Sequence, residues 1–197
     1  MRDVVARTLG EALAAGREEL RAAGIREPAR EAARLWAAVS GGRPGGAALE
    51  RERPLAPHEA DALHAAVTRR AAGEPFAYVT GVGGFRFLEV TCDRRTLIPR
   101  PETEGLVERV LERVPGGRVA DIGTGSGCLA VSLAKAGAQV VATDLSQAAL
   151  DLAAENAAAL GLQASVCFKQ GDALEALNGE AVFDLVVSNP PYIEDGD

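Results

Sequence analysis

The residues Asn189-Pro190-Pro191-Tyr192, which directly follow the apolar run 183–188, have the groups needed to hold a planar NH2. The Asn189 side-chain oxygen and the Pro190 carbonyl, held by the fixed φ of proline, could accept two hydrogen bonds from one such group. An amide or aromatic NH2 is a poor nucleophile because its lone pair is delocalised, so orienting it toward an electrophilic methyl group is useful chemistry. Tyr192 would stack on the planar group or form one wall of the pocket around it. The alternative is an ordinary Pro-Pro turn in which the tyrosine only packs.

A glycine loop forms a second candidate site at residues 121–127, Asp121-Ile122-Gly123-Thr124-Gly125-Ser126-Gly127. Glycines at this spacing allow a tight turn and a close approach of the backbone to a ligand beside a helix N-terminus. The acidic Asp121 at its start would repel a phosphate, and it suits a ligand with a positive amino or sulfonium group. The alternative is a strand-to-helix turn that binds nothing.

Two further acids end predicted strands. Asp144 lies 23 residues after Asp121 and can accept hydrogen bonds from both hydroxyls of a ribose, although it could equally be a solvated loop acid or a helix cap. Asp172, within Gly171-Asp172-Ala173, can accept a hydrogen bond from the exocyclic amine of adenine. Together with the glycine loop, these acids predict a site for a nucleoside that carries a cationic tail.

These residues need a scaffold, and the chain from residue 102 onward predicts one. Apolar runs at 118–122, 139–144, 164–170 and 183–188 read as strands, and helical patterns begin at Glu102 and Leu129. Ser146 can cap a further helix that runs to Leu160. Strands that alternate with helices predict a parallel, Rossmann-like α/β sheet, whose carboxyl strand ends would gather the candidate residues at one edge.

The first part of the chain has a different character. Residues 1–72 are rich in Ala, Leu, Arg and Glu, and helices are predicted to begin at Pro28 and at Pro57, where a first turn tolerates proline. Alternation over 83–91 predicts a strand or hairpin. The predicted domains are therefore a helical bundle over 1–72, a linker with a β-hairpin over 73–100, and a Rossmann-like domain over 101–197.

Composition limits the partners. The formal net charge of -7, without a dense basic run, disfavours direct contact with nucleic acid. No apolar stretch of about 18 residues and no export leader is visible, so we expect a cytoplasmic protein that does not enter a membrane. The spacing of Cys92, Cys128 and Cys167 matches no metal or redox pattern, which predicts buried free thiols and no metal site.

The motifs together resemble those of class I S-adenosylmethionine-dependent methyltransferases that act on an amino group. Two upstream segments resemble more narrowly those of the peptide chain release factor glutamine methyltransferases. They are Glu74-Pro75-Phe76-Ala77-Tyr78-Val79-Thr80-Gly81 and Leu97-Ile98-Pro99-Arg100-Pro101-Glu102-Thr103-Glu104. The resemblance covers nearly the whole chain, and it is most specific from Glu74 to Tyr192. It implies methyl transfer to the side-chain amide nitrogen of the glutamine in the Gly-Gly-Gln motif of bacterial release factors, with the helical part helping to grip that protein.

The resemblance also implies residue roles. The methionine and ribose parts of S-adenosylmethionine would be bound by Asp121, Gly123, Thr124, Gly125, Ser126, Gly127 and Asp144. Its adenine would lie beside Asp172 and Ala173. Some relatives have a bulky aromatic where Ala173 stands. The substrate glutamine would be held by Asn189, Pro190, Pro191 and Tyr192. Asn189 would also lie near the methionine end of the cofactor. The catalytic residues would be Asn189, Pro190 and Tyr192. Residues Arg100 to Thr103 would flank the site without assigned roles, and a Pro-rich turn that caps the following helix explains them equally well.

The sequence departs from that family at its C-terminal end. About four of the seven strands of the family's sheet are predicted here, which suggests part of a longer enzyme whose fourth strand would have an unpaired outer edge. A full-length form is expected to be a monomer. Two alternatives stay open: methylation of an adenine or cytosine NH2 on a flipped base, and a catalytically silent fragment that binds cofactor or release factor only.

Overall fold

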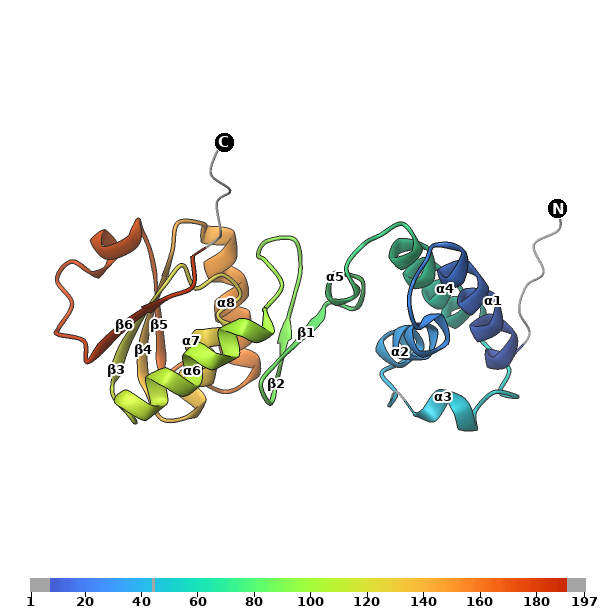
Figure 1. Cartoon of the computed structure of the whole chain (residues 1–197), viewed down its shortest axis with the longest axis horizontal. Helices are drawn as coiled ribbons and strands as arrows, with labels where there is room; N and C mark the ends of the chain where they lie inside the picture. Colours follow the sequence, from blue (N-terminus) through green and yellow to red (C-terminus); the bar gives the residue numbers. More distant parts are fainter. Residues whose placement is uncertain (1–7, 44, 191–197) are drawn as a thin grey trace. The chain divides into compact units, whose positions relative to one another are not determined.

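The chain folds into two compact units, Met1–Thr80 and Gly81–Asp197 (Figure 1). The computed structural model describes residues 8–43 and 45–190, so Pro191 and Tyr192 lie outside the described residues. Each unit has its own core and is described separately. The finer three-part division expected from the sequence stays a prediction.

The first unit is helical, as predicted. Helices were expected to begin at Pro28 and Pro57, and both do, with proline in the first turn, where its missing N–H costs no hydrogen bond. A third long helix precedes them and begins with a capping box between Thr8 and Glu11. The helices of this unit are α1 (Leu9–Ala22), α2 (Pro28–Ser40), α3 (Gly46–Leu49), α4 (Pro57–Ala71) and α5 (Phe76–Thr80).

Helices α1, α2 and α4 contact one another around an apolar core. Its largest members, Leu20, Leu35, Trp36 and Leu63, are each at most 3% exposed. Gly16 allows α1 to lie close to α4, because a Cβ at this position would be 3.0 Å from a methyl carbon of Val67. Val39, near the end of α2, is 38% exposed.

The second unit opens with the predicted hairpin, formed by β1 (Val82–Phe85) and β2 (Leu88–Thr91) in antiparallel pairing. Its two-residue turn places Arg86 at a φ of 53°, a left-handed conformation that costs energy for a residue with a side chain. Contacts to the following helix hold that turn: the Arg86 N–H donates to Glu104 at 2.9 Å, and its guanidinium pairs with Glu108 at 2.6 Å.

The remainder of the unit alternates helix and strand, and this confirms the expected α/β class. The elements are α6 (Pro101–Arg113), β3 (Arg118–Ile122), α7 (Cys128–Lys135), β4 (Gln139–Asp144), α8 (Gln147–Ala159), β5 (Val166–Gln170), the 3-10 helix η1 (Ala173–Leu177) and β6 (Leu185–Ser188). All four strands are parallel, in the order β5-β4-β3-β6. The chain therefore progresses from β3 to β5 on one side and then returns to the other side of β3. In open α/β sheets such a reversal creates the ligand crevice.

Figure 1 shows α6, α7 and α8 on one side of this sheet, with η1 and the segment that leads into β6 on the other. α6 contacts β6, α7 contacts β4, and α8 contacts both β4 and β5. Ser146 caps α8, as predicted, by accepting the Ala149 N–H through its side chain at 3.3 Å. The helices thus cover one face of the sheet and bring their N-termini to the carboxyl ends of the strands.

Two strands begin later than predicted. β5 begins at Val166 and β6 at Leu185, whereas the apolar runs began at Ala164 and Phe183. Before β6, Asp184 contacts β3 through its backbone and its side chain: its N–H donates to the Arg118 carbonyl at 2.8 Å, and its carboxylate accepts the Arg118 N–H at 2.7 Å. The Phe183 ring lies 4.3 Å from the Arg118 guanidinium. Among the described residues, β6 pairs with β3 alone.

The prediction of three buried thiols is wrong for one cysteine. Cys92 and Cys128 are buried, and burial raises the pKa of Cys128 to about 12, which keeps this thiol protonated. Cys167 is exposed. It lies on the terminal strand β5 and shares a sheet face with Val141 and with Val186, itself 48% exposed. An apolar sequence neighbourhood does not show which sheet face a residue occupies or what covers that face.

Candidate functional site

The carboxyl ends of β3 and β6 meet at the point where the strand order reverses. Ile122 and Ser188 are register partners at the last position of each strand, and the Ser188 hydroxyl donates to the Ile122 carbonyl at 2.9 Å. The glycine loop therefore begins beside the segment that begins with Asn189. Two motifs separated by more than sixty residues in sequence are brought to one edge of the sheet.

The glycine loop turns back over β4. The N–H groups of Gly123 and Thr124 both donate to the Thr143 carbonyl at 2.9 Å, and the Gly125 N–H donates to one carboxylate oxygen of Asp144 at 2.9 Å. The other carboxylate oxygen of Asp144 accepts the Ser146 N–H at 3.0 Å. Asp144 is thus anchored beside the loop and is only partly buried, so its carboxylate has further lone pairs available for a ligand.

Asp121 lies beneath the same loop and is 2% exposed. Burial, and to a smaller extent the nearby charge of Asp144, raise its pKa to about 6 against the opposing effect of a 2.7 Å hydrogen bond from the Thr124 hydroxyl. Among the described residues, no ion pair involves Asp121. A buried carboxylate that has no cationic partner among the described residues is suited to a ligand that carries a positive group.

The amide of Asn189 is held by a residue that lies far away in the sequence. Its Nδ2 donates to the hydroxyl oxygen of Thr103 at 2.7 Å, and Thr103, in the first turn of α6, is 5% exposed. The sequence marked Arg100 to Thr103 as a flanking segment but assigned no contact. Helical spacing could have indicated that Thr103 is buried, since it lies one turn before the buried Val107 and two turns before the buried Val110.

The turn after β5 joins this edge of the sheet. The Gly171 N–H donates to the Asp144 carbonyl at 3.1 Å, which brings Asp172 and Ala173 beside β4. Both residues are exposed, and Ala173 has a φ of 44° at the start of η1. Sequence reasoning overlooked two apolar neighbours: Leu145 is 66% exposed directly after Asp144, and Leu174 is 64% exposed directly after Ala173. For Leu145 the sequence signal was its position directly after the strand-ending Asp144.

These contacts bring the described candidate residues to one edge of the sheet. Pro190 is exposed beside Asn189, while Pro191 and Tyr192 lie outside the described residues. Within residues 8–43 and 45–190, no group of three or more His, Cys, Asp or Glu side chains is arranged to hold a metal ion. In the same ranges no helix combines the length and the apolar character needed to cross a membrane.

A parallel sheet with a glycine loop, a strand-ending acid and an amide at its reversal point defines a Rossmann-like domain of the class I methyltransferase type. Comparison with known proteins agrees for both units. The family model described as the PrmC N-terminal domain matches residues 11–81, and the model described as the methyltransferase small domain matches residues 101–197.

Curated relatives named release factor glutamine methyltransferase are similar over most of the chain. The relative from Moorella thermoacetica is 46% identical over 194 residues, which is 94% of this chain and 67% of that protein. The relative from Rhodospirillum rubrum is 41% identical over 96% of this chain and 59% of its own length. The relative from Xylella fastidiosa strain 9a5c is 53% identical over 71% of this chain and 52% of its own length. The chain belongs to the release factor glutamine methyltransferase family. It spans about half the length of the Xylella relative and two thirds of the Moorella relative.

Proposed function

We propose that this chain carries the methyl-transfer site of an enzyme that methylates the side-chain amide nitrogen of the glutamine in the Gly-Gly-Gln motif of bacterial peptide chain release factors. The observation that carries the proposal is the orientation of Asn189, whose Nδ2 is engaged by Thr103 beside the glycine loop. This arrangement leaves the Asn189 Oδ1 available to accept a hydrogen bond from an incoming NH2. Membership of the family supports glutamine as the source of that NH2.

S-adenosylmethionine is the proposed cofactor, and when bound it supplies an electrophilic methyl group on a sulfonium centre. The residues present fit it. The buried carboxylate of Asp121, which forms no ion pair with the described residues, suits the cationic methionine end, and the backbone of Gly123 to Gly127 permits a close approach. Asp144 would accept the ribose hydroxyls. Asp172 and Ala173 would border the adenine, with the exposed Leu145 and Leu174 as apolar contacts for its ring.

Asn189 and Pro190 would act on the substrate. Their two oxygens accept both N–H groups of the glutamine amide, which aligns the nitrogen and favours positive charge on it as the new N–C bond forms. The cofactor would supply the methyl group and keep the electron pair of the broken methyl–sulfur bond, and the amide nitrogen would lose one proton to solvent. Pro191 and Tyr192 would complete the wall around the amide. No strong general base is needed before the transfer.

The remaining expectations belong to the same proposal. Residues 1–72 would help to grip the release factor, residues 73–100 would link the units, and residues 101–197 would bind the cofactor. The enzyme would work in the cytoplasm, without direct contact with nucleic acid. The net charge of -7 supports the last point, because nonspecific binding to phosphates requires basic side chains.

Methyl incorporation tests the proposal. Labelled S-adenosylmethionine is incubated with purified release factor or with DNA, using this chain and a C-terminally extended form in parallel. We expect label in the release factor, and none after its Gly-Gly-Gln glutamine is replaced by alanine. Label in DNA alone would replace the proposal by base methylation. Cofactor binding by both forms without any transfer would identify a binding module.

A further inference from the structure

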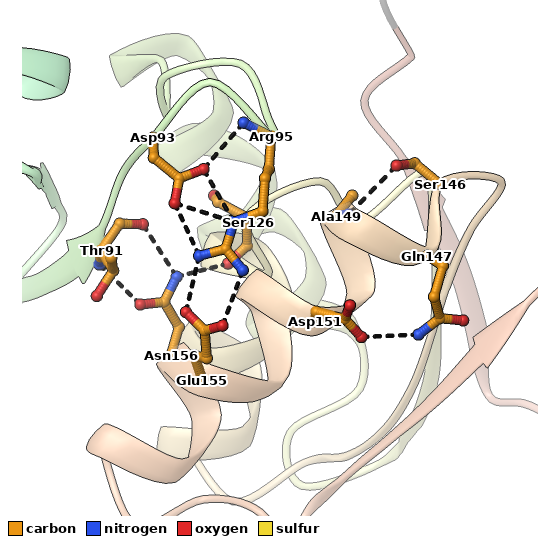
Figure 2. A network of polar contacts seen from close by, with 10 residues as sticks. All are labelled: Thr91, Asp93, Arg95, Ser126, Ser146, Gln147, Ala149, Asp151, Glu155 and Asn156. Carbon is orange, nitrogen blue, oxygen red and sulfur yellow. Dashed lines mark hydrogen bonds and ion pairs between the residues drawn. The ribbon is translucent and has the colours of Figure 1, made fainter.

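Asn156 is a buried amide in the middle of α8 that the site described above does not use. It is 1% exposed and lies among buried apolar residues of its helix, with Leu152, Ala153 and Ala157 as neighbours on the same stripe. A polar side chain at such a position is costly unless its hydrogen bonds are satisfied. Asn156 satisfies them with two segments far away in sequence (Figure 2).

The amide of Asn156 connects the hairpin to the glycine loop. Its Oδ1 accepts the Thr91 N–H at 2.7 Å, while its Nδ2 donates to the Thr91 carbonyl at 3.2 Å and to the Ser126 carbonyl at 2.9 Å. Thr91 ends β2, and Ser126 belongs to the glycine loop and is 3% exposed. One planar group must therefore accept once and donate twice, which a carboxylate or an aliphatic side chain of the same size cannot do.

A second contact from the same helix face reaches the next residue of the loop. Ala153 stands one turn before Asn156, and a Cβ built on Gly127 would be 2.8 Å from the Ala153 Cβ. Gly127 also has a φ of 75°, so glycine is required there for both backbone conformation and space. α8 thus contacts the loop at Ser126 through a hydrogen bond and at Gly127 through packing.

An ion-pair cluster beside Asn156 also joins these segments, but it is more exposed. Arg95 pairs with Asp93 at 2.7 Å and with Glu155 at 2.8 Å, and the Arg95 side chain is 30% exposed while that of Glu155 is 54% exposed. Figure 2 shows this cluster next to the Asn156 amide. Solvent-exposed ion pairs contribute little to stability because water and salt screen them. The buried amide is therefore the specific connection.

We propose that Asn156 is a positioning residue for the cofactor loop: by holding the Ser126 carbonyl against the end of the hairpin, it keeps the loop in its ligand-binding form. This inference rests on the proposed function, since it concerns the loop assigned there to S-adenosylmethionine. It adds a role for α8 and for the hairpin, neither of which contributes a proposed ligand contact of its own.

The test is Asn156→Asp, which has nearly the same shape and can still accept the Thr91 N–H but cannot donate to Ser126 when ionised. Binding of S-adenosylhomocysteine to the full chain is measured by calorimetry, and amide hydrogen exchange is followed at Thr91 and Gly127. We expect at least a tenfold loss of affinity and faster exchange at Gly127, with Thr91 still protected. Glu155→Gln, the matched control on the same helix, removes the ion pair to Arg95 and should change affinity less than twofold.

Asn156→Ser serves as a second variant if the aspartate does not fold, and it should also weaken binding and speed exchange at Gly127. Unchanged affinity and exchange in a folded Asn156 variant would overturn the inference, as would an equal loss in Glu155→Gln. If the unsubstituted chain binds no S-adenosylhomocysteine, the proposed cofactor is wrong for this chain. Exchange at Gly127 then still decides whether Asn156 positions the loop.

Discussion

At the scale of single residues, Asn189 is the side chain on which the proposed chemistry depends. Asn189→Ala should reduce methyl transfer to release factor by about two orders of magnitude or more, because the nitrogen loses an oriented acceptor in the transition state. Cofactor affinity should stay within about tenfold, or roughly 1.4 kcal/mol. Steady-state rates and a separate S-adenosylhomocysteine titration measure the two effects. An equal loss of rate and affinity would contradict the assigned role.

Asp144 should act on cofactor binding. Asp144→Ala removes a carboxylate that anchors the Gly125 N–H and is proposed to accept ribose hydroxyls. Charge-assisted hydrogen bonds of this kind predict about a ten- to hundredfold weaker S-adenosylhomocysteine complex in a titration. Asp151→Ala, which removes an exposed carboxylate from α8, is the control and should bind normally. An unchanged affinity in Asp144→Ala would place the ribose elsewhere.

Asp121 should give the ligand-free protein a distinctive pH dependence. Its pKa is raised from 3.8 to about 6, so between these values the folded chain binds more protons than the unfolded chain, and stability from this group falls as pH rises. Asp121→Asn should therefore gain stability relative to wild type between pH 4 and pH 8, by about 3 kcal/mol at most. Denaturant unfolding at both pH values measures this gain.

A control for that experiment is Asp93→Asn. Hydrogen bonds from Arg95 lower the pKa of Asp93, so its contribution to stability is present above its ordinary pKa and is lost as pH falls. Because that loss falls below about pH 4, Asp93→Asn should differ from wild type by nearly the same free energy of unfolding at pH 4 and at pH 8. A stability difference between Asp121→Asn and wild type that does not vary with pH would show that Asp121 is not the perturbed group.

At the scale of elements, the first turn of α6 and the end of β6 act together. Thr103 and Asn189 are 86 residues apart in sequence and 2.7 Å apart at their hydrogen-bonded atoms. The hydroxyl of Thr103 accepts from Nδ2, and this contact determines which way the amide of Asn189 faces. We therefore infer that α6 positions a side chain that it does not carry.

Thr103→Val tests this link by replacing the hydroxyl with a methyl group of similar size. The catalytic rate should fall by about ten- to a hundredfold, because a small misplacement of a reacting group has effects of that order. Thr103→Ser keeps the hydroxyl and should retain most of the activity, while both variants should bind S-adenosylhomocysteine normally. Similar rates for the valine and serine variants would show that the hydroxyl does not position the amide.

At the scale of the whole molecule, the two units have separate cores. The core residues of the first unit, including Leu35, Trp36 and Leu63, all lie before residue 81. Part of its polar network is also internal, since Arg70 pairs with Glu31 at 2.8 Å between α4 and α2. A unit with its own core and its own ion pairs should be able to fold independently.

Residues 1–80 produced alone should therefore unfold cooperatively. Trp36 is the single tryptophan and is 3% exposed, so its fluorescence reports this unit alone. We expect the fluorescence transition of the isolated unit to have a denaturant midpoint close to that in the full chain. A broad, non-cooperative transition in the isolated unit would show that it depends on the second unit.

Much of this architecture could be predicted from local sequence patterns. Strands β3 and β4 begin and end where their apolar runs do, and prolines mark the starts of α2 and α4, because hydrophobic periodicity and proline geometry act over a few residues. The gathering of the glycine loop, Asp144 and Asn189 at one edge also followed from sequence. Parallel strands joined by helices must place their carboxyl ends together.

Only the tertiary structure decided how these residues are held. The burial of Asp121, the exposure of Cys167 and the contacts made by Thr103 and Asn156 depend on segments distant in sequence that pack against one another. A side chain's type determines which hydrogen bonds it can make, whereas its partner is determined by which backbone lies beside it after folding. The residue types of the candidate site could thus be predicted from the sequence, whereas their support by α6 and α8 could not.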